Sequence, residues 1–383
     1  MIRSTKALSA GAGLVTALSL GLGTAAHADI APAPSDVVGV GSDTVQNIAN
    51  FLADGDTGGT PGYNTAGNLN RIISFDATPD QNDRAGYLNG STNASLKALN
   101  PTVVLRAGLN PVQRPNGSSA GLAALNLDKG STEVINFVRS SRLPTDAEQT
   151  TAISNGWGGL HVVRLSTDEL RIGAATTTNA PAALTPAQLV SIYKCTDTTW
   201  TAVGGTSANT IIPLVPQNGS GTRSSFLADL KSANGNTDVP LGSCVQTVEE
   251  NDPSSITGAS SPADAIAPFS GGRKNLYDSG YFKDSTVKFG SAPVALTSGL
   301  QLLSGTGAYL NTRGLYIVFR DKDVTATAPF QPGGTKNWVQ TLFANPGGTT
   351  PFVNTNAGKA DIASGGATPS YQDCGTGVGT TCS

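Results

Sequence analysis

The sequence predicts an α/β protein made of two lobes, and two observations carry this prediction. Apolar runs with the composition of short buried strands alternate with segments of helical periodicity over most of the chain. Such alternation is typical of layered α/β folds with largely parallel sheets. A short polar loop also occurs twice, at 115–121 and 217–223, once in each half of the chain. Because each loop leads into a helical segment, the two halves are expected to be lobes that meet at these loops.

Strands are expected where Val, Ile, Leu and Phe cluster between glycine and polar residues. The pair 160–165 and 169–173 is expected to flank a crossing between the lobes. The tail from residue 347 is rich in glycine and threonine and is expected to be held near its end by a cysteine pair. The expected strands are 36–41, 71–75, 133–138, 160–165, 169–173, 211–215 and 314–320.

Helices are expected where apolar residues recur at spacings of three and four. Ser42-Asp43-Thr44 can cap the first of them, and Thr185 with Pro186 can open the third. These polar turns lie where a strand gives way to a helix, which is where ligands bind in open α/β sheets. The expected helices are 45–53, a segment that opens with 122–125, 184–193, 225–230 and 337–343.

Residues 1–28 have the features of a secretory signal peptide. Arg3 and Lys6 form a basic start, an apolar stretch runs from 10 to 22, and Ala26-His27-Ala28 is a small-x-small cleavage site. We expect cleavage before Asp29 and export of a soluble protein, to a periplasm or to the outside of the cell. The first cysteine is Cys195, so no lipid-anchor cysteine is expected.

The charge balance argues against nucleic acid and acidic membrane surfaces as partners. The formal net charge is −3, and it becomes more negative when the basic residues of the signal peptide are removed. Four cysteines suit an oxidising destination. They allow three connectivities, of which Cys195–Cys244 with Cys374–Cys382 is the most parsimonious.

Catalytic and metal chemistry find little support in the sequence. His161 is the one histidine that remains after cleavage, and it stands beside Val162 and Val163 in an expected strand. A Ser-His-Asp arrangement is therefore not expected. The chain has no Walker loop and no metal-type spacing of histidine and cysteine. We expect a protein that is not an enzyme and that needs neither a metal nor a cofactor.

The two polar loops carry the chemistry of an anion site. They read Pro-Asn-Gly-Ser-Ser-Ala-Gly at 115–121 and Gln-Asn-Gly-Ser-Gly-Thr-Arg at 217–223. A Gly-Ser turn that opens a helix offers free backbone N–H groups, hydroxyls and the positive end of the helix dipole. A single Asn-Gly-Ser is usually only a turn. Two of them, with Ser42-Asp43-Thr44 as a third capped turn, predict one small anion held between the lobes.

The ordered set of motifs resembles the phosphate-binding proteins of ABC importers, in the type II periplasmic binding protein superfamily. The closest stretch is 184–227, which reads LTPAQL-x-x-IY, then W, then I-x-P-x-VPQNGSGTRSSF. The run VGVGSDTVQ at 38–46 is similar to the family's first strand and ligand-binding turn, and FVRSSRLP at 137–144 to its FGASD turn. The resemblance covers roughly residues 36–300.

This resemblance implies a type II fold in which each lobe has a mixed sheet flanked by helices, with two hinge crossings. Lobe I would comprise 29–168 and 295–383, and lobe II would comprise 169–294. The resemblance also implies which side chains and backbone groups meet the anion. The implied phosphate-binding residues are Asp43, Thr44, Ser118, Ser140, Ser141, Arg142, Ser220, Gly221, Thr222 and Arg223.

One departure from the family pattern leaves the source of positive charge open. The family's phosphate-facing arginine lies three residues before Gly-Ser-Gly-Thr, where this chain has Pro216. Arg139, Arg142 or Arg223 is expected to supply the charge instead. The acidic run 249–252 is typical of a solvated turn, with the rim of the cleft as the alternative.

A second departure concerns selectivity. The family's buried aspartate at FGASD aligns here with Ser141 or Arg142. Asp43 is then the candidate to accept the proton that phosphate carries and sulfate lacks. When the bound anion carries no proton, the buried carboxylate has no donor to pair with. This costs a few kcal/mol, on the order of the penalty for an unpaired buried polar group.

These inferences together predict an exported monomer that captures inorganic phosphate or a similar oxyanion between two lobes. The membrane subunits of an ABC importer are the expected protein partner. The alternative is an extracellular interaction or surface protein that keeps the binding fold without transport, and the missing lipid-anchor cysteine motivates it.

Overall fold

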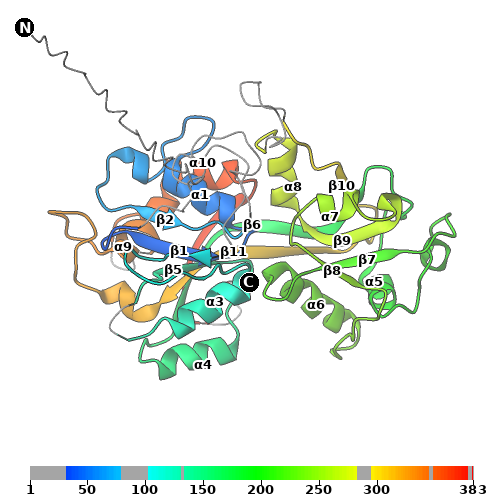
Figure 1. Cartoon of the computed structure of the whole chain (residues 1–383), viewed down its shortest axis with the longest axis horizontal. Coiled ribbons are helices and arrows are strands. Elements are labelled where there is room, and N and C mark those ends of the chain that lie inside the picture. Colours follow the sequence, from blue (N-terminus) through cyan, green and yellow to red (C-terminus); the bar gives the residue numbers. More distant parts are fainter. Residues whose placement is uncertain are drawn as a thin grey trace, which may run out of the picture.

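The computed structural model describes residues 32–78, 102–130, 133–282, 295–344 and 348–377, together with Cys382. The predicted signal peptide, residues 1–28, and its cleavage site lie outside the described residues. Figure 1 shows two groups of helices and strands joined by two long strands, β6 (Leu160–Ala175) and β11 (Leu310–Arg320). The predicted two-lobed α/β fold class is therefore confirmed. Within the described ranges, no helix is both long and apolar enough to cross a bilayer.

One mixed sheet runs through both lobes. Its strand order is β2-β1-β5-β11-β6-β9-β7-β8, with β10 and β12 also paired to β6. Strand β1 pairs in parallel with β2 and β5, and β7 pairs in parallel with β8 and β9. The described partners of β6 and β11 are antiparallel. The sheet is thus mixed, as the resemblance implied, rather than largely parallel. The remaining strands of this sheet are β1 (Val37–Gly41), β2 (Ile72–Ser74), β5 (Phe137–Ser140), β7 (Ile212–Pro216), β8 (Gln246–Val248), β9 (Ala265–Ser270), β10 (Leu300–Leu302) and β12 (Thr368–Gly375), and a separate pair is β3 (Thr102–Val103) with β4 (Val112–Gln113).

The predicted strands 160–165 and 169–173 are one continuous strand, β6, so the expectation of two separate strands is wrong. The polar residues between them, 166–168, do not end the strand because they continue the pairing with β11. Asp168 is buried and lies opposite Arg313 of β11, with which it forms a 3.0 Å ion pair. The antiparallel pair of β6 and β11 therefore connects the two lobes.

The helices begin largely at the polar turns expected from the sequence. Thr185 accepts the Gln188 N–H and completes a capping box at α5, and Ser220 caps α6 by accepting the Arg223 N–H. The expected side-chain cap of α1 by Ser42-Asp43-Thr44 is wrong, because the N-cap is Val45 and these polar side chains bind other partners. The helices are α1 (Gln46–Asp54), α3 (Ser118–Leu127), α4 (Asp146–Ser154), α5 (Pro186–Tyr193), α6 (Gly221–Ala233), α7 (Ser254–Thr257), α8 (Gly271–Asp278), α9 (Trp338–Leu342) and α10 (Asn356–Ser364).

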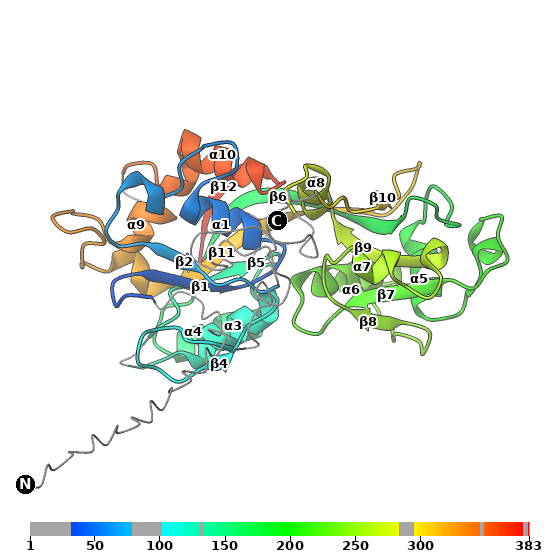
Figure 2. The same cartoon turned by 45° about the horizontal axis from the view of Figure 1, so that its top comes forward.

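Each lobe buries apolar side chains on both faces of the sheet. In one lobe, α1, α9 and α10 cover one face and α3 with α4 the other, as Figure 2 also shows. In the other lobe, α5 and α6 cover one face and α7 the other. Leu165 belongs to the first lobe's core and Leu170, further along the same strand, belongs to the second lobe's core. We keep as a proposal that lobe I ends at residue 168 and that the chain returns to it at residue 295.

Two regions differ from the sequence predictions in extent. The strand expected at 133–138 starts only at Phe137, because the Asp128 carboxylate accepts the N–H groups of Val134 and Ile135 at 2.8 and 2.7 Å. The glycine- and threonine-rich tail contains α10 and β12, which the composition did not indicate.

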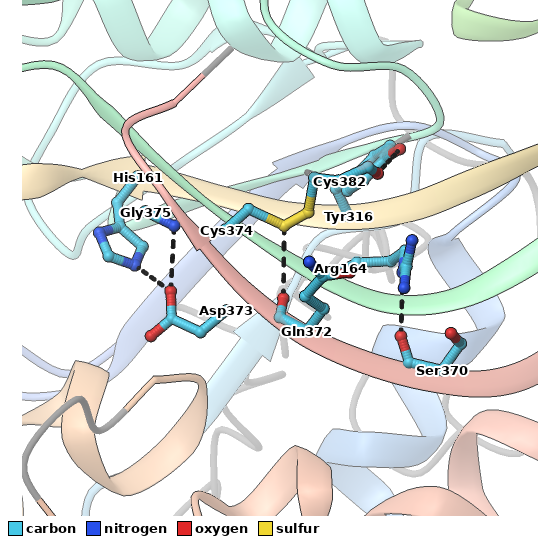
Figure 3. Close-up of a disulfide and its surroundings, with 9 residues drawn as sticks. All are labelled: His161, Arg164, Tyr316, Ser370, Gln372, Asp373, Cys374, Gly375 and Cys382. Atoms are coloured by element: carbon cyan, nitrogen blue, oxygen red, sulfur yellow. Dashed lines mark hydrogen bonds and ion pairs between the residues drawn. A yellow bond between two sulfur atoms is a disulfide. The ribbon is translucent and has the colours of Figure 1, made fainter. Parts of the chain in front are cut away.

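The structure pairs Cys195 with Cys244 and Cys374 with Cys382, the connectivity that the sequence favoured. Figure 3 shows the second disulfide at the end of β12, where the Tyr316 hydroxyl donates to the Cys382 carbonyl oxygen at 2.9 Å. Nearby on β12, Asp373 binds His161 Nε2 at 2.7 Å. These contacts hold β12 against the sheet.

Candidate functional site

Turns from both lobes meet at one place between them. The turns that follow β1 and β5 and the start of α3 come from one lobe, and the turns that follow β7, β8 and β9 come from the other (Figure 1). Because β1 and β5 are parallel neighbours, as are β7, β8 and β9, their carboxyl ends lie along common edges. Open α/β sheets bind ligands at this kind of edge.

The two polar loops lie against one another. The Ser119 N–H donates to the Gly219 carbonyl oxygen at 2.9 Å, and Gln217 donates to the Asn116 side chain at 3.2 Å. Gly117 has φ +103°, and a Cβ there would collide with the Gly219 backbone. Glycine is therefore required at Gly117 both for its backbone conformation and for the close approach of the second loop.

Hydroxyl groups from the first lobe gather at the start of α6. Ser118 Oγ accepts the Ser141 N–H at 2.9 Å and lies 3.3 Å from Ser141 Oγ. Ser42 Oγ lies 3.5 Å from the same Ser141 oxygen. A Cβ on Gly221 would collide with the hydroxyls of Ser118 and Ser141, so these groups pack directly on the first turn of α6.

The first turn of α6 is buried and holds a carboxylate. Ser220 caps the helix, while the Thr222 N–H donates to Glu250 Oε1 at 3.1 Å. Thr222 Oγ1 is buried and has no hydrogen-bond partner among the described residues. The turn thus presents a hydroxyl without a partner in the described ranges and an N–H that already binds an anionic oxygen, which are the groups that an anion site uses.

A buried polar cluster faces this turn from the first lobe. The Thr44 hydroxyl lies 3.2 Å from Glu250 Oε1 and 3.3 Å from Asp43 Oδ1. Asn251 Nδ2 donates to Thr44 Oγ1 at 3.0 Å and to Asp43 Oδ2 at 3.3 Å, and its Oδ1 accepts the Ser270 N–H at 2.9 Å. Asn251 has φ +52°, a conformation that asparagine tolerates better than most residues. These contacts join the two lobes.

The electrostatics of the cluster are dominated by two neighbouring carboxyls. Burial, and then the charge of Glu250, raise the pKa of Asp43 well above its ordinary value, while Arg273 acts in the opposite direction. Burial also raises the pKa of Glu249. A carboxyl that is held protonated can donate to an oxyanion, and an ionised one can accept a proton from it.

Arg273, which none of the sequence predictions named, is a buried positive charge beside the cluster. It lies in the first turn of α8, is 3% exposed, and donates from Nη1 to Asn47 Oδ1 of the other lobe. Its guanidinium carbon lies 5.1 Å from the Phe282 ring centroid. Its Nε has no hydrogen-bond partner within the described part of the chain. A buried donor of this kind, next to Asp43, suits an anionic ligand.

A sequence signal for Arg273 exists. Ser220-Gly221-Thr222-Arg223 follows β7, and Ser270-Gly271-Gly272-Arg273 follows its parallel neighbour β9. In both segments the serine caps the helix by accepting the arginine N–H. The repeated Ser-Gly-x-Arg pattern could therefore have indicated a second helix terminus facing the site.

The structure brings together most of the predicted site residues, but not all. Asp43, Thr44, Ser118, Ser141, Ser220, Gly221 and Thr222 lie buried in the cluster. Ser140 instead binds the backbone of Arg142. Arg142 forms a bidentate pair with Glu148 at 2.7 and 2.8 Å, and Arg223 donates to the Pro216 carbonyl oxygen at 2.8 Å.

Two other expectations change. The candidate Arg139 is fully buried and donates to the Gly41 and Ser42 carbonyl oxygens, so it stabilises the turn that follows β1. The acidic run 249–252 is not simply solvated, since Glu250 and Asn251 are 1% and 3% exposed. The run carries lobe-to-lobe contacts that its composition did not reveal.

A cavity of about 140 Å³ opens beside the cluster. It is lined on one side by Glu249, Glu250 and Asn251 and on the other by Arg273 and Tyr277. A single water needs on the order of 10–15 Å³, so the cavity has room for an ion or for a rotated side chain. In the described ranges, no group of three or more His, Cys, Asp and Glu residues is arranged to hold a metal ion.

Comparisons with known proteins agree with this architecture. Residues 78–355 match the family model described as a PBP superfamily domain, which covers well over half of the chain. A comparison with curated proteins returns no match. Among solved structures, the chain is similar to a phosphate ABC transporter substrate-binding protein from Clostridium perfringens with bound phosphate, at a TM-score of 0.52 and 14% identity over 88% of this chain and 99% of that one.

It is also similar to an ABC-type phosphate transport receptor from Vibrio cholerae, at a TM-score of 0.50 and 18% identity over 87% of this chain and 99% of that one. At such identities the likeness shows the fold. The chain belongs to the PBP superfamily and has the two-lobed fold of these two receptors.

Proposed function

We propose that this protein is an exported solute-binding protein that captures inorganic phosphate, or a similar oxyanion, between its lobes for an ABC importer. Binding is sequestration without chemistry. The two solved structures named above are, by their titles, phosphate-transport proteins. This favours capture for import over the alternative of a surface protein without transport.

The observation that carries the proposal is the buried convergence of hydroxyl, N–H and guanidinium donors from both lobes. Thr44, Ser118 and Ser141 come from one lobe, and Thr222 and Arg273 come from the other. Hydrogen bonds to charged groups contribute about 1.5–3 kcal/mol each. Several such bonds, less the desolvation of the ion and of the site, are enough for micromolar affinity, which corresponds to about −8 kcal/mol.

Asp43 gives the site a basis for preferring phosphate to sulfate. It is fully buried between Thr44 and Asn251. Phosphate near neutral pH carries a proton and can share it with this carboxyl, whereas sulfate brings only negative charge. This preference requires Asp43 to be ionised when the anion is bound, a state that the charge of Arg273 favours. A buried carboxylate facing an unprotonated anion is strongly unfavourable.

The connection between the lobes supports a hinge. The strands β6 and β11 cross from one lobe to the other, and the ion pair of Asp168 and Arg313 lies on this crossing. Bending there would open the site and release the contacts between the polar loops. Lobe closure around a ligand is a known mode of domain motion.

The experiment is calorimetric titration of the mature protein and of the double variant Ser220→Ala with Thr222→Val. The double variant removes the helix cap and the unpartnered hydroxyl of the α6 turn. We expect phosphate affinity to fall about tenfold or more, as the loss of a charged hydrogen bond predicts. The matched control is Ser225→Ala, further along the same helix. Unchanged affinity in the double variant would contradict the assignment of this turn to the anion.

A further inference from the structure

The Glu250 carboxylate lies on the helix terminus that the proposed function assigns to the anion. Glu250 follows β8 in lobe II and is 1% exposed. Its Oε1 accepts the Thr222 N–H at 3.1 Å and lies 3.2 Å from the Thr44 hydroxyl. One carboxylate oxygen therefore uses a donor from each lobe, as an oxygen of a bound oxyanion would.

The neighbouring helix α8 offers a comparison, because its first turn binds an internal carboxylate whose two oxygens are both hydrogen-bonded. Its first turn binds Asp168, whose Oδ1 accepts the Gly272 N–H at 3.0 Å and the Ser270 hydroxyl at 2.9 Å. The other oxygen of Asp168 pairs with Arg313 at 3.0 Å. Both oxygens of that carboxylate are satisfied and its charge is neutralised, so it is a stable part of the fold.

Glu250 is satisfied on one side only. Its Oε2 is buried and receives no donor from the described residues, and it has the carboxyl of Asp43 as a close electrostatic neighbour. Nearby, Thr222 Oγ1 and Arg273 Nε are buried donors that also lack partners within the described part of the chain. Leaving buried acceptors and donors unpaired is unfavourable. A tetrahedral anion with several oxygens could satisfy these donors, which the planar carboxylate does not.

The structure also contains a cavity into which the Glu250 side chain could rotate. The cavity of about 140 Å³ has Glu250 in its wall and extends toward Thr78, Asp252 and Tyr277. A rotation of the side chain into this cavity would release the Thr222 N–H without moving the backbone of either lobe.

We propose that Glu250 is an internal competitor for the anion, which phosphate must displace from the first turn of α6 in order to bind. This inference rests on the proposed function. The competition sets the affinity of the site, because the apparent dissociation constant equals the intrinsic one divided by the fraction of time that Glu250 is displaced from the turn. If the carboxylate is in place nine-tenths of the time, apparent affinity is about tenfold weaker than the intrinsic affinity.

The test is calorimetric titration with inorganic phosphate of the mature protein, of Glu250→Ala and of Asp252→Ala. The control also removes one negative charge at the same cavity but has no contact with Thr222 among those observed. We expect Glu250→Ala to bind phosphate about tenfold more tightly or better. The control should stay within roughly twofold, because the Asp252 carboxylate is only partly buried and binds the Ser254 N–H and hydroxyl, so that solvent screens its charge. Glu250→Asp keeps the charge but shortens its reach to the Thr222 N–H, so it too should bind more tightly.

Thermal unfolding of each variant separates misfolding from altered binding. If Glu250→Ala does not fold, the phosphate affinity of Glu250→Asp tests the inference. Phosphate binding by the mature protein with equal or weaker binding by both variants would overturn the inference and leave the proposed function standing. Absence of phosphate binding in the mature protein and in both variants would overturn the inference together with the function on which it rests.

Discussion

Replacing Arg273 with Gln tests whether its buried guanidinium supplies the positive charge of the site. The side chain is 3% exposed, and it stands close enough to Asp43 to act on the pKa of that carboxyl. Gln retains a hydrogen-bond donor but removes the charge, together with the contacts that only the longer guanidinium reaches.

The expected loss follows from the contacts. A hydrogen bond to a charged group contributes about 1.5–3 kcal/mol, which corresponds to a factor of roughly 10–150 in the dissociation constant for phosphate. The variant also loses the cation–π contact with Phe282, at 5.1 Å, and the bond to Asn47 of the other lobe. The free energy of unfolding should therefore fall by about 1–3 kcal/mol.

The assay is phosphate titration by calorimetry, with a thermal melt of the same samples. Arg223→Gln is the matched control, since Arg223 holds the corresponding position of α6 but donates to the Pro216 carbonyl oxygen. We expect the control to keep its affinity within about threefold, because the Arg223 guanidinium binds the Pro216 carbonyl oxygen and not the buried cluster. Phosphate affinity of Arg273→Gln equal to that of the mature protein, with the fold intact, would refute the assignment.

Two further predictions concern stability. Burial and the nearby Asp56 raise the pKa of Asp361 to about 8. The protonated form therefore stabilises the fold at low pH, and this stability is lost as the pH rises from about 4 toward 8. Asp361→Asn should flatten the fall of Tm across this range, and an unchanged pH profile would contradict the burial of an unpaired carboxyl. The Cys195–Cys244 disulfide closes a separation of 49 residues, so replacing both cysteines with Ser should lower the free energy of unfolding in urea by about 4 kcal/mol on the chain-entropy model; a loss under about 1 kcal/mol would mean that the unfolded chain is not constrained by this bond.

Local patterns in the sequence predicted the parts of the site that are built from short segments. The second polar loop has its helix start at Gly221 because Ser220 is a good N-cap, and Thr185 opens α5 for the same reason. The alternation of strands and helices predicted the fold class up to about residue 250. These features depend on interactions between residues close in the chain, which a single sequence records.

Features that depend on distant partners were not predicted. Glu250 and Asn251 look like a solvated turn until β8 places them against Thr44 of the other lobe. Strand β12 is polar and becomes a strand because it pairs with β6 and is held by its disulfide. Arg142 has the chemistry of an anion ligand but forms an ion pair with Glu148, in the first turn of α4. Tertiary partners decided each of these cases.

We propose above that the interlobe cluster binds phosphate and uses Asp43 to recognise the proton that phosphate carries. The most direct measurement is calorimetric titration of the mature protein, freed of bound anion by partial unfolding and refolding, with phosphate and then with sulfate. We expect micromolar or tighter phosphate binding and no heat from sulfate. Equal binding of both anions would contradict the role of Asp43, and no heat from either would contradict the claim as a whole.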